Sequence, residues 1–239
     1  MVKPFKTIWL SLALTLSLAS TSAAQDWNYT VTPYLWAPAL NLNLDVGPNP
    51  PVSGETNVLE VIDGALLLQG EARRGKWSIL GEFNYLNLSD DFGEGPGGVT
   101  AGWRVQGTMI ALAAAYAVHE NKDTRVDVLG GVRAWNLDTT TTVGNAKATK
   151  NSNFIDPMIG VRFETPFGKK AKFSGLFNIG GGNFGSDRQL ETTAQIKWPV
   201  RDTMTFALGY RYLSLDFDED NVIMDASLSG PFAALSFNF

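Results

Sequence analysis

The chain has 239 residues, no cysteine, and 19 Lys and Arg residues against 24 Asp and Glu residues, so its formal net charge is −5. The lack of cysteine excludes disulfides and thiolate metal sites, and the acidic balance argues against a nucleic-acid partner. A mean hydropathy near zero is typical of a chain whose lipid-facing and lumen-facing residues alternate.

The N-terminal segment predicts export. Lys3 and Lys6 make the start of the chain positively charged. An apolar stretch follows at Ile8–Leu18, and small residues come directly after it. This is the pattern of a secretory signal peptide, and the apolar stretch is shorter than the about 20 residues of a membrane-spanning helix. We expect a cleaved signal peptide over 1–24 and one domain over 25–239, with an uncleaved anchor as the alternative.

Ten strand-like stretches follow in chain order, each ended by a turn or loop signal. They are Tyr29–Leu44, Ala65–Arg73, Trp77–Asn87, Trp103–Val118, Thr124–Thr140, Phe154–Thr165, Ala171–Gly181, Leu190–Trp198, Thr203–Asp216 and Ala226–Phe239. Their connections alternate in length. The short ones are 74–76, 119–123, 166–170 and 199–202, and the long ones are 45–64, 88–102, 141–153, 182–189 and 217–225. Short turns alternating with long loops are typical of an outer-membrane barrel with both termini on the turn side.

Several of these stretches alternate apolar and polar residues with a period of two, which indicates strands with one polar face. No apolar run after the signal reaches helical spanning length, and an exported chain without such a run crosses a membrane only as a closed barrel. We therefore expect an all-β, antiparallel, up-and-down transmembrane barrel. Ten strands is the first prediction, and eight is the alternative because two stretches are short. The side chains expected to contact lipid are Val161, Phe163, Ile196, Phe206 and Leu208.

Charged residues on the polar faces predict a charged lumen, because a cation facing lipid at mid-bilayer costs about 2–4 kcal/mol. The predicted lumen residues are Glu71, Glu82, Asp127, Arg133, Asp156, Arg162, Glu164 and Arg211. We expect the three arginines to pair with acids across neighbouring strands. The interior of a barrel with about eight strands is just filled by side chains. A salt-bridged plug is therefore the favoured interpretation, and a charged conduction path is the alternative.

Aromatic residues gather near both ends of the predicted strands, as expected where rings meet lipid headgroups. At the turn side these are Trp77, Phe167, Phe173, Trp198 and Phe239, and at the loop side Tyr85, Trp103, Trp135 and Tyr212. The alternative interpretation is that aromatic residues simply favour strands.

Signals for catalysis, metals and cofactors are weak, so we expect no enzymatic activity, no catalytic residue and no cofactor. The single histidine, His119, falls in a predicted short turn, and no histidine lies at the loop side, where outer-membrane barrel enzymes mostly place one. Acidic residues gather in two long loops without the spacing of an EF-hand, so we expect no metal site there. They are Asp90, Asp91, Glu94, Asp216, Asp218, Glu219 and Asp220.

Several motifs resemble a group of uncharacterised proteobacterial outer-membrane proteins and, more broadly, the small OmpA- and OmpW-like barrels. They are Thr32–Trp36, the Glu71–Trp77 hairpin, Leu129–Trp135, Asp156–Arg162, and a final strand that alternates up to Phe239. The resemblance implies an integral barrel in the bacterial outer membrane, with lipid and lipopolysaccharide around it. It also implies that Phe239 is the signal that the barrel-assembly machinery reads.

Four functions remain open at the level of sequence. The first is a structural or interaction barrel that displays its loops. The second is a narrow channel for small solutes or ions, or an OmpW-like lateral conduit for apolar molecules. A lipid-modifying barrel enzyme and a soluble lipocalin-like binder are the remaining alternatives; the latter reverses the polar and apolar faces.

Overall fold

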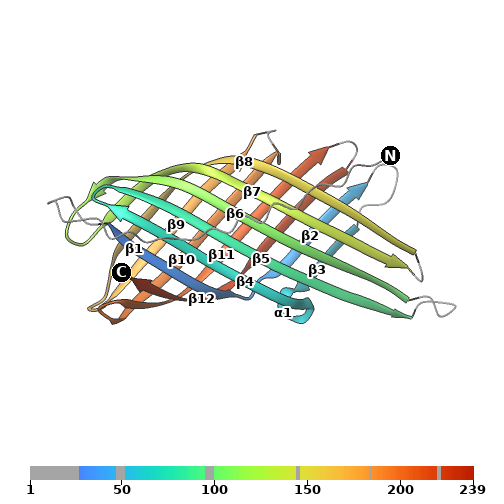
Figure 1. The fold of residues 1–239 in the computed structure, drawn as a ribbon, viewed down its shortest axis with the longest axis horizontal. Helices are drawn as coiled ribbons and strands as arrows, with labels where there is room; N and C mark the ends of the chain where they lie inside the picture. Colours follow the sequence, from blue (N-terminus) through green and yellow to red (C-terminus); the bar gives the residue numbers. More distant parts are fainter. Residues whose placement is uncertain (1–26, 47–51, 95–99, 144–145, 183–184, 220–221) are drawn as a thin grey trace, which may run out of the picture.

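The chain forms a closed ring of antiparallel strands (Figure 1). This computed structural model describes residues 27–46, 52–94, 100–143, 146–182, 185–219 and 222–239. The predicted signal peptide over 1–24 lies outside the described residues. No helix in the described ranges is long and apolar enough to cross a membrane.

Twelve strand segments and one short helix make up this part of the chain. In order they are β1 (Asn28–Trp36), β2 (Ala39–Val46), β3 (Val52–Asn57), α1 (Val58–Val61), β4 (Ile62–Arg74), β5 (Trp77–Glu94), β6 (Thr100–Glu120), β7 (Arg125–Val143), β8 (Ala146–Phe167), β9 (Ala171–Gly181), β10 (Arg188–Arg201), β11 (Met204–Glu219) and β12 (Val222–Asn238).

The ring closes between β1 and β12, which pair from Thr30 opposite Asn238 to Trp36 opposite Phe232. The other edge of β1 pairs with β4, and each strand from β4 to β12 pairs with the next along the chain. β2 continues β1 along β12, and β3 pairs with β2, so these two segments extend barrel strands rather than add new ones. The predicted ten-stranded, all-β, antiparallel barrel is therefore confirmed.

The first barrel strand breaks between β1 and β2, at Ala37 and Pro38. Proline lacks the N–H of a continuous ladder, while the Ala37 N–H still donates to the Pro231 carbonyl at 3.0 Å. Opposite the break lies Gly230, where an added Cβ would come within 2.2 Å of the Ala37 carbonyl oxygen. The Trp36 indole N–H donates to the Gly230 carbonyl at 3.2 Å. A glycine is thus required for β12 to pass the break.

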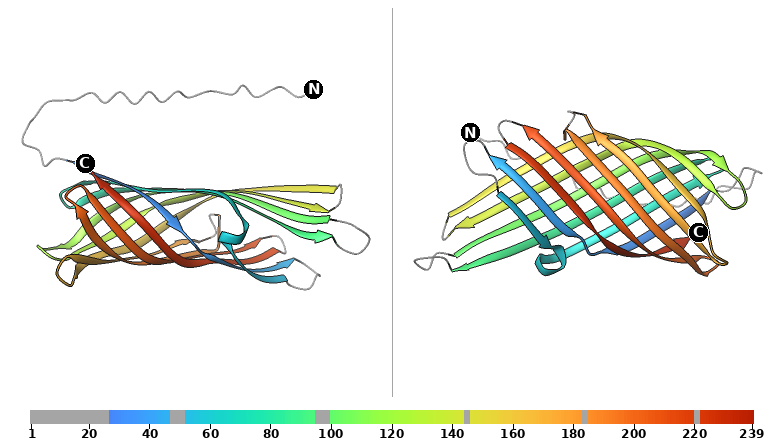
Figure 2. Two further views of the ribbon diagram at one scale, coloured as in Figure 1. Left: turned by 90° about the horizontal axis from the view of Figure 1, so that it is seen from below. Right: turned by 180° about the vertical axis from the view of Figure 1, so that it is seen from behind.

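The second barrel strand is interrupted by α1, which lies between β3 and β4. Pairing of β1 with β4 ends at Pro33 and Leu68, so the wall divides beyond this point and α1 fills the division. We call this the α1 seam. The Val58 N–H donates to the Pro38 carbonyl at 3.0 Å, and Val58 and Val61 are buried against Leu88. In Figure 2 (left), the long ends of β5 to β8 form one layer beyond the seam, and β2 and β12 belong to the other.

The short connections all lie at one end of the barrel, which we call the turn end, and the opposite end is the loop end. The turns fall at 75–76, 121–124, 168–170 and 202–203, as predicted. Gly75 and Gly168 have φ of 56° and 68°, a left-handed conformation that glycine adopts without steric cost.

The long loops were predicted too long. The segment 45–64, expected to be a loop, contains β3 and α1, and β5, β7 and β8 run well into the other predicted loops. These extensions are rich in polar residues, which is why their sequence indicates loops. An antiparallel ladder consists of backbone hydrogen bonds, so polar side chains do not end it.

Candidate functional site

An apolar belt covers the outer face of the barrel next to the turn end. In β11, Leu208 and Tyr210 point outward and are 46% and 53% exposed, while Ala207 and Arg211 point inward and are buried. Residues 204–212 match the about 9–11 residues of a tilted transmembrane strand. The other belt residues include Val31, Leu35, Ile79, Ile110, Leu112, Val128, Val132, Ile159, Val161, Phe163, Phe177 and Ile179.

The polarity of the two faces reverses part-way along the strands. Beyond Tyr212, Leu213 and Leu215 are buried inside, and the outward Asp216 bonds to Arg188 at 2.6 Å. On β6 and β7 the outward positions beyond Ile110 and Ala134 carry Thr108, Gln106, Asn136 and Asp138. Apolar residues inside and polar residues outside are the pattern of a sheet in water. The loop end therefore projects beyond the belt with an apolar interior.

The central ion cluster lies inside the barrel at the inner edge of that apolar region. It consists of Tyr34 on β1, Glu82 on β5, Arg133 on β7, Glu191 on β10 and Arg211 on β11. Glu191 bonds to Arg133 and lies 2.8 Å from Arg211. Arg211 lies 2.6 Å from both Glu82 and the Tyr34 hydroxyl. The Arg133–Glu191 and Arg211–Glu82 contacts join strands that are far apart around the ring, so the cluster crosses the lumen. The expectation that these arginines pair only across neighbouring strands is therefore wrong.

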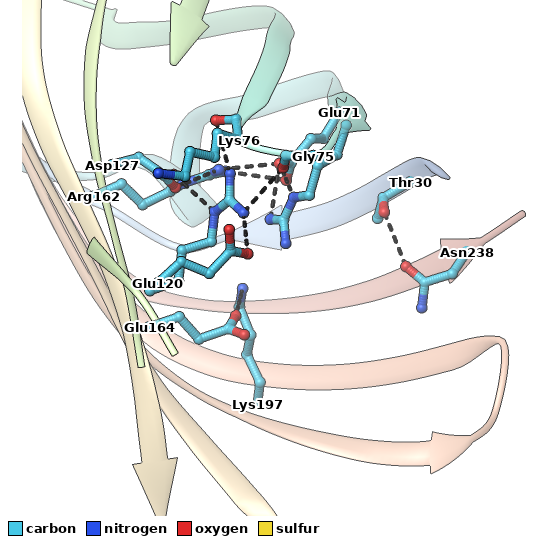
Figure 3. Close-up of polar contacts among 12 residues, drawn as sticks. Thr30, Glu71, Gly75, Lys76, Glu120, Asp127, Arg162, Glu164, Lys197 and Asn238 are labelled. Atoms are coloured by element: carbon cyan, nitrogen blue, oxygen red, sulfur yellow. Dashed lines mark hydrogen bonds and ion pairs between the residues drawn. The ribbon is translucent and has the colours of Figure 1, made fainter. Parts of the chain in front are cut away.

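The turn-side ion cluster forms a second layer across the lumen (Figure 3). Arg162 on β8 makes two 3.0 Å bonds to the Glu71 carboxylate on β4 and lies 2.8 Å from Asp127 on β7. Arg125 bonds to the other Asp127 oxygen at 2.8 Å and donates to the Lys76 carbonyl at 3.1 Å, in the turn between β4 and β5. Bidentate arginine–carboxylate bonds are among the strongest and most directional in proteins.

The remaining two predicted lumen charges have other partners than arginine. Glu164 bonds to Lys172 at 2.8 Å and to Lys197 at 2.9 Å. Asp156 is fully buried and accepts from the Ser186 backbone N–H at 2.9 Å, from the Ser186 hydroxyl at 2.8 Å, and from the Gln189 amide. The expected pairing of these two acids with arginines is therefore wrong. Lysines of β9 and β10 lie against Glu164, and the segment after β9 folds inward and supplies neutral donors to Asp156.

A cavity of about 190 Å³ lies between the two ion clusters. Its lining includes Arg133, Arg162, Glu191, Lys197 and Arg211, together with small residues of β6. Ten strands enclose somewhat more space than the about eight that side chains just fill, and the side chains of both ion clusters project into this space. No group of three or more metal-ligating side chains occurs among the described residues.

Two residues of the central ion cluster, Tyr34 and Glu191, were not among the lumen residues predicted from the sequence. Glu191 sits on the polar face of its strand, and Thr193 and Gln195 share that face, so alternation could have found it. Tyr34 gives no such signal, because a tyrosine on a strand is equally expected in an aromatic belt.

The predicted loop-side aromatic level holds only in part. Trp135 points inward, where its indole N–H donates to Gln189 at 3.3 Å and its ring stacks on Phe154. It belongs to the apolar interior of the loop end, not to a headgroup belt. The side chains of Trp103, Asp90, Asp91 and Glu94, and those of 217–220, lie outside the described part of the chain.

At the turn end, Phe239 lies beside β1. Its N–H donates to the Tyr29 carbonyl at 2.9 Å, and its own carbonyl accepts from Tyr29 at 3.2 Å. The side chain is 76% exposed and lies level with other exposed aromatic residues, among them Tyr29, Trp77 and Trp198.

No protein-family model matches the chain, and no curated protein is similar to it in sequence. Among solved structures, it is similar to the outer membrane protease OmpT of Escherichia coli, with a TM-score of 0.66 and 9% identity over 92% of this chain and 99% of that one. It also matches the Yersinia pestis attachment invasion locus protein Ail (0.41, 7% identity, 90% and 99% covered) and the translocator domain of the Neisseria meningitidis autotransporter NalP (0.48, 12%, 89% and 88%). The likeness to OmpT is one of fold, that of an outer-membrane β-barrel.

Proposed function

We propose that the chain is an integral barrel of the bacterial outer membrane whose lumen is closed, and that its role is structural: it holds the projecting loop end for interaction with other molecules. The membrane location is supported by the apolar belt, which would be costly in water, and by the barrel architecture. The observation that carries the closed lumen is the pair of ion clusters that cross it at two levels.

The physical argument is that a solute would have to break both layers to pass. In the central ion cluster, the side chains of Arg133, Arg211 and Glu191 are at most 2% exposed. Removing one member of such a buried pair leaves an unpaired charge, which costs about 3–5 kcal/mol. Thermal opening of the first layer alone is therefore rare, and the second layer adds to the barrier.

Conductance in planar bilayers tests this proposal. The refolded wild-type barrel should show little or no current, and a variant that removes one arginine from each layer, Arg162→Ala with Arg211→Ala, should show more. A large, stable, ohmic current through the wild type would overturn the closed lumen and support the channel alternative. A folded wild type that is fully soluble without detergent would overturn the membrane location.

An enzymatic role is not part of the proposal. The single histidine of the chain, His119, lies at the turn end, where its ring contacts Asn121 at 3.2 Å. It has no carboxylate or nucleophile against it among the described contacts. Although the OmpT structure is that of a protease, a similarity of fold does not carry its chemistry to this chain.

A second candidate, the lateral passage of apolar molecules, is favoured by the α1 seam. The apolar interior of the loop end meets the seam at Val58 and Leu88, and the outer edges of the seam carry the exposed Leu35, Leu59 and Leu66. The central ion cluster would stop an apolar molecule from moving down the lumen. The seam then offers a sideways exit bordered by apolar side chains.

Influx of an apolar fluorescent dye into intact cells tests the lateral route, because the lipopolysaccharide leaflet slows such dyes. Cells making the wild type should admit the dye faster than cells making Leu59→Arg, which places a charge at the outer edge of the seam. Ile155→Arg is the matched control, since Ile155 is similarly exposed but lies on β8, across the ring. Equal influx with all three proteins would rule this route out.

A further inference from the structure

The turn end of the barrel carries a ring of cations. Its exposed basic side chains are distributed over all four turns, and none forms an ion pair with another described residue. They are Arg74, Lys76, Lys122, Lys169, Lys170 and Arg201. The exposed acidic side chains in the described turns are fewer: Asp123, Asp202, and Glu120, which bonds to Arg125. The end of the barrel next to the apolar belt is therefore positively charged.

The loop end carries the opposite charge. Its strand ends and connections hold many acidic positions: Asp45, Glu55, Glu60, Asp63, Asp90, Asp91, Glu94, Asp138, Asp187, Asp216, Asp218, Glu219 and Asp225. Against these stand Arg104, Lys147, Lys150 and Arg188. The acidic net charge of the chain thus conceals a strong separation of charge along the barrel axis.

The cations of the turn end lie directly beside exposed aromatic rings. The Arg74 guanidinium carbon is 5.9 Å from the centre of the Trp27 ring, and the Lys76 ammonium is 5.9 Å from that of Tyr116. Amphipathic rings at the edge of an apolar belt sit at the level of lipid headgroups. The neighbouring cations therefore lie at the depth of the headgroup phosphates.

We propose that the turn end binds anionic phospholipid headgroups in the leaflet that it faces. This inference rests on the proposed membrane location. The shape of the charge pattern favours lipid over a soluble anion, because the cations form a ring around a closed lumen instead of converging on one site. Each lysine or arginine near an anionic membrane surface contributes about 1 kcal/mol, so six such residues give a marked preference over zwitterionic lipid.

Competition between brominated lipids tests the proposal, because Trp27, Trp77 and Trp198 are exposed at the turn end and bromine quenches tryptophan fluorescence. The full chain is refolded into phosphatidylcholine vesicles with and without phosphatidylglycerol. The wild type should bind phosphatidylglycerol in preference to phosphatidylcholine. The double variant Lys169→Glu with Lys170→Glu should lower this preference on the order of fivefold or more for each lysine changed. Added salt should weaken the preference, because exposed charges are screened.

The matched control is Lys147→Glu with Lys150→Glu, which makes the same change at the loop end of β8, the strand that leads into the turn of Lys169 and Lys170. This variant should keep the wild-type preference. The proposal is overturned if wild type shows no preference, or if the control loses as much as the turn-end variant. The neutral variant Lys169→Gln with Lys170→Gln repeats the test with less perturbation. Heat-modifiable gel mobility in pure phosphatidylcholine reports the barrel separately, and its absence in wild type would contradict the membrane barrel itself.

Discussion

Replacing Glu191 by glutamine should destabilise the barrel strongly, because this change removes a charge and almost no volume. Glu191 bonds to Arg133 and Arg211, and all three side chains are at most 2% exposed. Arg211 keeps Glu82 as a partner, but Arg133 keeps only the neutral Gln189. Breaking a buried ion pair in this way costs about 3–5 kcal/mol.

The measurement is urea unfolding in lipid vesicles, followed by tryptophan fluorescence. With a slope of about 2 kcal/mol per molar urea, the midpoint should fall by about 2 M. Lys197→Met is the control, because Lys197 shares the inward face of β10 but its pair with Glu164 is 28% and 27% exposed. Partly exposed pairs contribute less than fully buried ones, and Glu164 keeps Lys172 as a partner, so this variant should unfold closer to wild type than Glu191→Gln.

A double variant separates the ion pair from other effects. Arg133→Met added to Glu191→Gln should cost less than the sum of the two single changes, by about 0.5–3 kcal/mol. If Glu191→Gln unfolds within about 1 kcal/mol of wild type, the lumen is not the water-poor interior on which the cost depends. Water would then replace the lost charge, and the closed lumen would have to be abandoned.

Three further changes probe the belt, the strand break and the closing strand. Leu208→Arg should cost about 2–4 kcal/mol in vesicles, and a variant as stable as wild type would contradict the lipid-facing assignment. Gly230→Ala should destabilise the barrel by about 1–3 kcal/mol, because the added methyl group is overpacked against the Ala37 carbonyl. Gly81→Ala is the control, since Gly81 has open space around it, and it should not destabilise the barrel. Equal melting temperatures for the two variants would refute the close approach of Gly230 to Ala37. Phe239→Ala should slow membrane assembly, seen as a delayed heat-modifiable band, and unchanged kinetics would rule out its role as a signal.

The alternation of apolar and polar residues was sufficient to predict the barrel, its strand number and the apolar residues that point outward. It was also sufficient to place Arg162 and Arg211 inside. It did not identify Glu191 as the partner of Arg133, because alternation gives the face of a strand but not which distant strand lies across the lumen. The helix α1 spans four residues, too few for a helical period to appear, so it was predicted as part of a loop.

The reversal of polarity along the strands has a consequence for strand registration. A slip of one residue exchanges the two faces of a strand. A slip of two residues preserves them, and it would cost little in a barrel whose faces kept the same polarity along the whole strand. Here Phe83, Ile110 and Ala134 stand side by side at the last apolar row, with Thr108 and Asn136 in the next. A two-residue slip would carry an amide or hydroxyl into the apolar belt on one strand alone. The reversal of polarity therefore fixes the register of each strand against its neighbours along the barrel axis.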